Sequence, residues 1–420
     1  MDRPDTLAPS AEPSQPGQPE PPPAASIAPT QRLASIDAYR GLVMVLMMAE
    51  VLELGRVAAA FPDHRFWSFL SHHQEHVEWV GCSLHDLIQP SFSFLVGTSL
   101  AFSLARRTVQ GQRPWRIAAH ALWRSAVLVF LGIFLRSLGH ERTYYTFEDT
   151  LTQIGLGYPF LFVLGLRPRR EQWIAFVLIL VAVWAAFALY TPPVDHDYAA
   201  VGVSADWLRE HGLSGFAGRH WQKNGNLAWA FDRWFLNLFP RERPFSHNAG
   251  GYATLSFIPT LATMILGLIA GGWLREPNRD APRRLGTLTL AGLAGLGLGW
   301  ALNAAGLCPI VKRIWTPSWV LYSGGWCLLL LAAFHAVCDV AGWRRWSAPL
   351  RVVGVNSIAA YLMSWLWKDF IATNLRRHLG ETAFEAFGSE YEPLVHGAAV
   401  LLVLWLILWW MDRKRIYLKI

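Results

Sequence analysis

Apolar runs about as long as a lipid bilayer is thick recur along this chain. They cover residues 36–59, 84–105, 117–138, 151–166, 172–190, 254–274, 285–306, 317–339, 350–371 and 394–411. An α-helix needs about 20 apolar residues to cross the hydrocarbon core, where every backbone polar group must be satisfied internally. Of all residues 53% are hydrophobic and only 16% are charged. The sequence therefore predicts an all-α, polytopic membrane protein with about ten transmembrane helices.

Basic residues alternate between the loops that join these runs. Every second loop is basic, with Arg106, Arg107, Arg113 and Arg116; Arg167, Arg169 and Arg170; Arg275, Arg279, Arg283 and Arg284; Arg344, Arg345 and Arg351; and Arg413, Lys414, Arg415 and Lys419. This positive-inside pattern predicts that both termini are cytoplasmic and that the long loop 191–250 is extracytoplasmic. Since topology explains the net charge of +7, we expect the inner-membrane bilayer, and no nucleic acid, as a partner.

The chain divides into a short tail and a membrane domain. Residues 1–32 are polar and proline-rich, which predicts a disordered cytoplasmic tail without a cleavable signal peptide. Residues 33–420 hold all the apolar runs and form the predicted transmembrane domain.

Cysteine and histidine patterns give little reason to expect a disulfide scaffold or a metal. The sequence has 4 cysteines. Whether Cys82 and Cys308, which both fall near span ends, are bridged stays open. His72 and His76 are spaced to share one helical face, a weak zinc pattern without a partner motif. We predict no metal.

The most informative segment runs from His76 to Pro90. His76 lies just before the second apolar run, and Asp86 falls in the first turns of that run. Ionisable groups at membrane depth are costly, so they are functional-site candidates. A carboxylate that binds one imidazole nitrogen fixes the tautomer and makes the other nitrogen a better base. An interfacial histidine beside a helix-capping aspartate is the other interpretation. Gln89 indicates that this end faces a cavity.

Three further polar segments are candidates. Lys312 and Arg313 lie on the predicted outer side, against the positive-inside pattern, so they bind either an anionic ligand or acids of an outer loop. Arg40, at the inner start of the first run, pairs with Asp37 or meets an anionic cofactor. Asn356 lies inside the ninth run, where it binds a ligand or holds helices together.

The loop 191–250 combines aromatic and polar side chains. These include Trp207, Trp221, Trp229 and Trp234 with Asp206, Arg209, Asn224, Asp232 and Arg233. Such surfaces suit sugar rings, which stack and accept hydrogen bonds at once. Long loops of this kind are usually functional or disordered, and the aromatic content argues against disorder.

Together these segments resemble the heparan-α-glucosaminide N-acetyltransferase family of membrane acyltransferases and its bacterial relatives. The resemblance runs from about residue 33 to 370. It rests on Ser35-Ile36-Asp37-Ala-Tyr39-Arg40-Gly41, His76-x-x-Trp79-x-Gly81, Asp86-Leu87-x-x-Pro90, Phe94-x-x-Gly97-x-Ser99, Gly251 with Thr254-Leu255, Gly267-x-x-Ala270-Gly271, Cys308-Pro309-Ile310-x-Lys312-x-x-Trp315-x-x-Ser318 and Gly354-x-Asn356-Ser357. Val80 and Gln89 depart from the pattern, at positions where we expect a polar and an aromatic residue.

The resemblance implies acetyl transfer across the bilayer. Acetyl-CoA would enter from the cytoplasm, and an amine or hydroxyl of an extracytoplasmic sugar or glycan would accept the acetyl group. His76 would act as general base or transient acyl carrier, oriented by Asp86. Residues expected to contact the cofactor are Lys312, Trp315, Ser318, Asn356 and Arg40, and those expected to contact the acceptor are Trp79, Gln89, Asp232 and Arg233.

Two other classes of function remain. In a transporter or flippase for a glycan or lipid-linked sugar, His76 and Asp86 would form a proton relay. The two halves of the sequence show no internal repeat, which counts against this reading. A structural membrane subunit would leave the polar groups at span ends unexplained. The acceptor, the acyl chain, the choice of one or two steps, and a homodimeric state stay open.

Overall fold

The computed structural model describes residues 33–276, 279–418 and 420. Within these ranges the regular structure is helical, and the β-type pairing is limited to an isolated bridge between Val80 and Val311. The predicted all-α fold class is therefore confirmed. The tail 1–32 and Lys419 lie outside the described residues, so the disorder predicted for the tail stays a prediction.

Seven of the described helices are long and apolar enough to cross a membrane. They are α4 (Ile88–Val109) with the short helix η2 (His85–Leu87) before it, α5 (Pro114–Arg136), α7 (Arg169–Leu189), α11 (Phe257–Arg275) after η4 (Thr254–Ser256), α12 (Ala281–Ala304), α13 (Pro317–Phe334) continuing into η5 (His335–Val340), and α17 (Glu392–Arg413) after η7 (Ser389–Tyr391). Two shorter apolar helices are α6 (Thr150–Gly165) and α15 (Ser357–Leu366). The protein is thus a helical membrane protein, and the number of about ten spans stays a prediction.

The first predicted run is interrupted near its end. Helix α1 (Ala34–Met48) passes into η1 (Ala49–Leu52), and the chain then turns at Glu53 into α2 (Leu54–Ala60). Glu53 has a left-handed backbone with φ of 46°, which cannot continue a right-handed helix. The charged Glu50 and Glu53 therefore mark the end of the apolar helix within the first predicted run.

The ninth predicted run is not one helix. It divides into α14 (Ala348–Val355), α15 and α16 (Lys368–Leu379), with breaks at Asn356 and Trp367. The Asn356 side chain donates to the carbonyl of Ile416 (2.8 Å) and accepts from the amide of Leu418 (3.1 Å). A polar side chain with partners outside the helix competes with helical geometry, which explains the first break.

Helices α4 and α11 form the centre of the bundle. Both are mostly buried, whereas α5, α7, α12 and α17 are largely exposed on the outside of the described structure. Gly97 lies directly against the backbone carbonyl of Met264, and Gly267 lies against that of Phe94. A side chain at either glycine would push the two helices apart, so these small residues permit the close packing.

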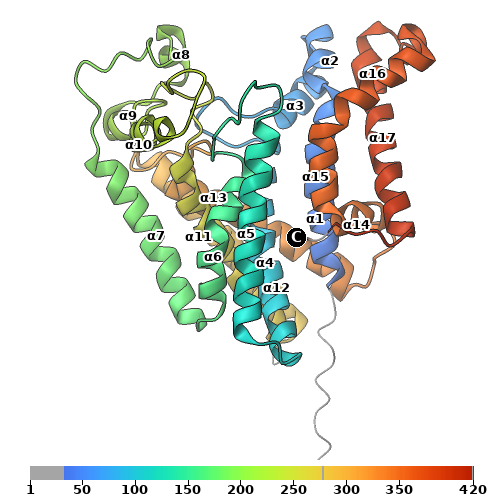
Figure 1. Ribbon diagram of the computed structural model, residues 1–420, viewed down its shortest axis with the longest axis horizontal. Helices are drawn as coiled ribbons and strands as arrows, with labels where there is room; N and C mark the ends of the chain where they lie inside the picture. The colour runs from blue at the N-terminus through green and yellow to red at the C-terminus, as the bar shows by residue number, and fades with distance from the viewer. Residues whose placement is uncertain (1–32, 277–278, 419) are drawn as a thin grey trace, which may run out of the picture. The chain divides into compact units, whose positions relative to one another are not determined.

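The other described helices pack beside this pair or beside one another, as Figure 1 shows. Helix α12 packs along α13, and α5 packs along α6. A second group joins α1, α14, α15 and α17. The long loop carries α8 (Ala205–His211), α9 (Gly215–His220) and α10 (Leu227–Phe235), and the helix α3 (Arg65–Gln74) forms in the connection after the first run.

Three segments far apart in the sequence meet at one end of the helices. The indole of Trp79 donates to the carbonyl of Trp221 in the long loop (3.2 Å). The guanidinium of Arg313 donates to the carbonyls of Gly250 (2.8 Å) and Val77 (3.2 Å). Three segments therefore lie at the same end of the helices: the connection that holds His76, the long loop, and the segment before α13. The charge pattern predicts this common location.

Candidate active site

The loop before α4 wraps around the carboxylate of Asp86. Oxygen Oδ2 accepts hydrogen bonds from the amide of Val77 (3.2 Å), the amide of Ser83 (3.0 Å) and the hydroxyl of Ser83 (3.1 Å). The Ser83 hydroxyl also lies within hydrogen-bond distance of the Glu75 carbonyl (2.6 Å). The carboxylate is buried. It is thus fixed by its own loop, with Oδ1 left for other partners.

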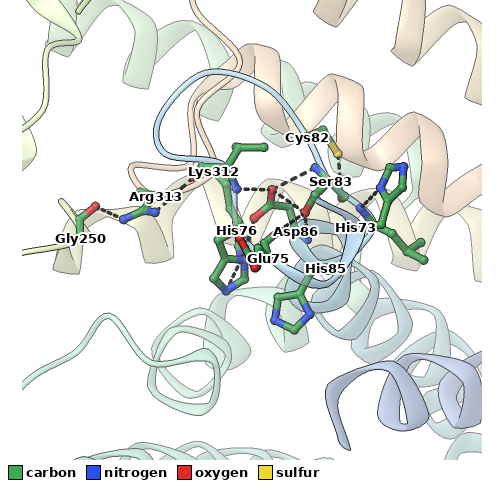
Figure 2. A network of polar contacts seen from close by, with 12 residues as sticks. His73, Glu75, His76, Cys82, Ser83, His85, Asp86, Gly250, Lys312 and Arg313 are labelled. Atoms are coloured by element: carbon green, nitrogen blue, oxygen red, sulfur yellow. Dashed lines mark hydrogen bonds and ion pairs between the residues drawn. The ribbon is translucent and has the colours of Figure 1, made fainter. Parts of the chain in front are cut away.

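Oxygen Oδ1 of Asp86 meets two basic side chains, as Figure 2 shows. It lies 2.8 Å from Nδ1 of His76 and 3.3 Å from Nζ of Lys312. His76 thus folds back across ten residues to reach the carboxylate. The spacing of the two residues in the sequence permits this contact. With Nδ1 bound to Asp86, Nε2 is the nitrogen available as a base.

Lys312 reaches this position through a tight turn before α13. The amide of Gly81 donates to the carbonyl of Ile310 (3.0 Å), which fastens the two loops together beside the Val80–Val311 bridge. Thr316 caps α13 by accepting from the amide of Trp319 (3.2 Å). The Lys312 ammonium lies 3.0 Å from Nδ1 and 3.3 Å from Nε2 of His76. Lys312, Asp86 and His76 therefore form one cluster.

Burial and charge act together on the two basic groups. Burial lowers the pKa of His76, the hydrogen bond to Asp86 opposes this, and the charge of Lys312 lowers it further. Burial also lowers the pKa of Lys312, and Asp86 opposes that effect. The lowered pKa of His76 favours the neutral imidazole, which is the form that a general base needs.

The imidazole of His76 faces a cavity of about 360 Å³, a volume typical of small-molecule sites. Its side chain is 35% exposed, whereas Asp86 behind it is covered. The cavity is lined on the other sides by polar and aromatic residues, among them Arg136, Glu148, Asp149, Tyr252, Tyr361 and Trp365.

These residues form a second polar wall around Asp149. Its carboxylate caps α6 through the amide of Leu151 (2.8 Å) and accepts from the hydroxyl of Tyr361 (3.0 Å). Nε of Arg136 lies 3.5 Å from the same carboxylate, and the guanidinium stands over the ring of Trp365. Sequence reasoning missed Arg136, Glu148 and Tyr252. Arg136 could have been identified from the sequence, because it is a basic residue at the predicted outer end of a span, as Lys312 is.

The residues predicted to contact the acceptor are only partly at this cavity. Gln89 lines it and donates to Gln153 (3.1 Å). Trp79 is buried beneath the long loop. Asp232 accepts from the amide of Thr254 (2.9 Å) before α11, and Arg233 lies over the ring of Trp229. Neither Asp232 nor Arg233 is among the residues that line this cavity.

Of the residues predicted to contact the cofactor, Lys312 alone lines the cavity within the described ranges. The indole of Trp315 donates to Thr263 (3.1 Å), and the hydroxyl of Ser318 donates to the Pro309 carbonyl (2.6 Å). Asn356 ties the break after α14 to the end of the chain. Arg40 donates to Ser99 (2.5 Å) and lies 3.6 Å from Asp37. In these contacts the four residues hold segments together.

Cysteines and metal ligands give no further site. All four cysteines, which lie within the described ranges, are free thiols, so Cys82 and Cys308 are not bridged in this structure. Burial raises the pKa of the Cys308 thiol to about 11. No group of three or more metal-ligating side chains occurs in the part of the chain that the structure describes.

Two curated proteins are similar to this chain, whereas no family model matches it. Heparan-α-glucosaminide N-acetyltransferase of Homo sapiens is 23% identical over 430 aligned residues, which cover 93% of this chain and 60% of that protein. The Mus musculus protein of the same name is 24% identical over 372 residues, covering 79% and 53%. The chain thus spans between half and two thirds of the length of the relatives it matches. The similarity over most of the chain supports a distant family relationship with the heparan-α-glucosaminide N-acetyltransferases.

Proposed function

We propose that this protein is a membrane-bound acetyltransferase. It moves an acetyl group from cytoplasmic acetyl-CoA to an amine or hydroxyl of an extracytoplasmic sugar or glycan. One observation carries the proposal: the imidazole of His76, held through Nδ1 by the buried Asp86, faces a cavity that Lys312 also lines. The distant relatives, named as N-acetyltransferases of a glucosaminide, support acetyl as the group transferred.

The chemistry follows from Nε2 of His76, the nitrogen that Asp86 does not bind. Nε2 takes the proton of the acceptor as its nitrogen or oxygen attacks the thioester carbonyl. The new carbon–nitrogen or carbon–oxygen bond forms, the carbon–sulfur bond breaks, and the proton ends on the thiol of CoA. A two-step route would use the same Nε2 to carry the acetyl group. The ammonium of Lys312 lies 3.3 Å from Nε2, close enough to stabilise the oxyanion that develops on the carbonyl.

The second polar wall supports a sugar as the acceptor. Trp365 and Tyr252 offer aromatic surface, and Glu148 and Asp149 offer carboxylate oxygens, all facing the cavity that His76 enters. Sugar rings are bound by this combination, because one face stacks while the hydroxyls form hydrogen bonds.

The test of this function is a transfer assay on the purified full-length protein. Radiolabelled acetyl-CoA is supplied with a panel of aminosugars and glycans, and transferred label and released CoA are measured. We expect His76→Ala to lower transfer at least about 100-fold, the usual contribution of a general base. His72→Ala is the matched control, because His72 is an exposed histidine on the neighbouring helix α3 and should leave transfer unchanged.

Two results would contradict the proposal in different ways. If no acceptor is acetylated and no CoA is released, while proteoliposomes take up a sugar, the protein is a transporter. If His76→Ala keeps full activity, the enzyme class survives and the site assignment is wrong.

We further propose that His76 faces the extracytoplasmic side of the inner membrane. Glu210 in the long loop and Arg283 in the first turn of α12 both have mostly exposed side chains, and the charge pattern predicts opposite sides for them. In intact cells a membrane-impermeant thiol reagent should label Glu210→Cys, and should label Arg283→Cys only after permeabilisation. The reverse pattern would overturn the orientation.

A further inference from the structure

A second imidazole–carboxylate pair lies next to the first. Nε2 of His85 lies 2.8 Å from Oε1 of Glu50, which comes from η1 at the end of the first apolar segment. The rings of His85 and His76 have centroids 4.5 Å apart and are tilted by 54°. Both histidines and Glu50 line the same cavity. In Figure 2 the two imidazoles point to the same side of Asp86.

The two pairs are buried in opposite ways. In the first pair the His76 side chain is 35% exposed and Asp86 is 1% exposed. In the second pair His85 is 7% exposed and Glu50 is 51% exposed. His76 thus meets the cavity with its carboxylate hidden, whereas His85 is enclosed and its carboxylate reaches solvent. The more exposed ring of His76 is suited to contact a bulky acceptor. The enclosed ring of His85 is suited to transfer a proton.

Acetyl transfer needs two proton movements at different atoms. The acceptor nitrogen or oxygen must lose a proton, and the departing sulfur of CoA must gain one. A single imidazole can do both only if it moves between the two atoms, whereas two neighbouring imidazoles can divide the task. Two imidazolium rings at 4.5 Å repel each other. The two rings are therefore not expected to be charged at the same time.

We infer that His85, positioned by Glu50, is the general acid that protonates the leaving thiolate, while His76 is the base. This inference rests on the proposed acetyltransferase function. In the step, the acceptor proton goes to Nε2 of His76, the carbon–sulfur bond breaks, and a proton on Nδ1 of His85 goes to the sulfur. The proton on His76 then passes to His85, directly or through water in the cavity, and both rings return to their starting states without net proton exchange.

The charged groups around the two rings are compatible with this division. Asp86 and Lys312 contact His76, and Glu50 contacts His85. Lys368, at the start of α16, lines the same cavity. Each imidazole thus has a carboxylate of its own, which lets either ring carry the proton at its stage of the cycle.

The experiment compares two acetyl donors that differ in leaving group. Acetyl-CoA releases an alkyl thiolate that needs a proton, whereas S-(4-nitrophenyl) thioacetate releases the stable 4-nitrothiophenolate, which leaves without one. With His85→Gln we expect kcat to fall about 100-fold with acetyl-CoA and less than about 3-fold with the activated donor, with KM for acetyl-CoA unchanged. His76→Ala should lose activity with both donors. His72→Gln is the control and should lose activity with neither.

A second measurement uses chemical rescue with the natural donor. In His85→Ala, added imidazole fills the space of the missing ring and should restore kcat with acetyl-CoA as its concentration rises. Glu50→Gln should lower kcat about 10-fold, since it positions the acid without touching the substrate. If His85 had only a structural role, replacing it would lower kcat equally with both donors, and added imidazole would not restore kcat.

The outcomes separate this inference from the proposed function. If the wild type transfers no acetyl group, the function itself fails. If the wild type is active and His85→Gln and His85→Asn keep full kcat with acetyl-CoA, His85 is not the acid. Equal loss with both donors, together with no rescue by imidazole, overturns the inference as well.

Discussion

Two histidine–aspartate pairs with a covered carboxylate occur among the described residues, and they differ in how accessible the imidazole is. Nδ1 of His76 lies 2.8 Å from Asp86, and Nδ1 of His335 lies 3.0 Å from Asp339. The second pair lies in the π-helical turn η5 after α13. His76 opens into a cavity, whereas the side chain of His335 is only 4% exposed. The same pair of residue types is thus accessible in one place and sealed in the other.

The partners of the carboxylates also differ. Asp86 holds a lysine together with its histidine, which places a second positive group beside the imidazole. Asp339 instead accepts from the amide of Ala34 (3.0 Å) and so fastens the start of α1 to the end of α13. Pairing therefore orients the imidazole in both places, and access together with a second charge is what makes the first pair the candidate reaction site.

The largest expected effect is at Asp86. Asp86→Asn removes the acceptor that fixes the tautomer of His76 and leaves Lys312 buried without its counter-charge. We expect kcat/KM for acetyl transfer to fall by about 1,000-fold or more, by analogy with other bases that lose their orienting carboxylate. Purified variants are compared by radiolabel transfer, and Asp86→Glu is the control that keeps the charge. Retained activity in Asp86→Asn would remove the distinction between the two pairs.

A smaller effect is expected at Lys312, with a pH signature. Removing the ammonium in Lys312→Met should lower kcat about 100-fold if it stabilises the oxyanion. Because the charge of Lys312 lowers the pKa of His76, its removal should raise that pKa. Activity needs neutral His76, so the acidic limb of the kcat–pH profile should move to higher pH. An unchanged limb would show that Lys312 does not act on His76, and Lys312→Arg should keep the wild-type limb.

At Asp339 we expect an effect on stability with little effect on catalysis. Asp339→Asn weakens the bond to His335, and this loss should cost about 1–3 kcal/mol as for other buried hydrogen bonds to charged groups. The variant should unfold at lower temperature in detergent while its kcat stays within about 3-fold of wild type. A large fall in kcat with unchanged thermal stability would mean that the second pair also serves the reaction.

The smallest expected effect concerns a buried carboxylate that lacks an imidazole. Burial raises the pKa of Asp232 to about 7, above its value in an unfolded chain. Its protonated form therefore favours folding at low pH, and this contribution is lost as the pH rises through about 7. The melting temperature should fall between about pH 5 and pH 7, and Asp232→Asn should flatten that part of the curve. The same slope in both proteins would exclude Asp232 as its source.

Much of the fold could be read from the sequence, because it depends on local hydrophobicity. Each apolar run contains helix, and the charged Glu50 and Glu53 mark the end of the first one. The break at Asn356 could not be predicted, since its partners lie near residue 416, about 60 residues along the chain.

The sequence by itself determined that His76 and Asp86 stand ten residues apart in one connection, a spacing that permits the contact between them. Only the tertiary structure decided that Lys312, 236 positions away, completes the cluster, and that Arg136, Asp149 and Tyr361 form the opposite wall. It also decided that Trp315, Ser318, Asn356 and Arg40 hold segments together. Polar residue types serve packing and catalysis alike, and the difference lies in which groups surround them and whether a cavity reaches them.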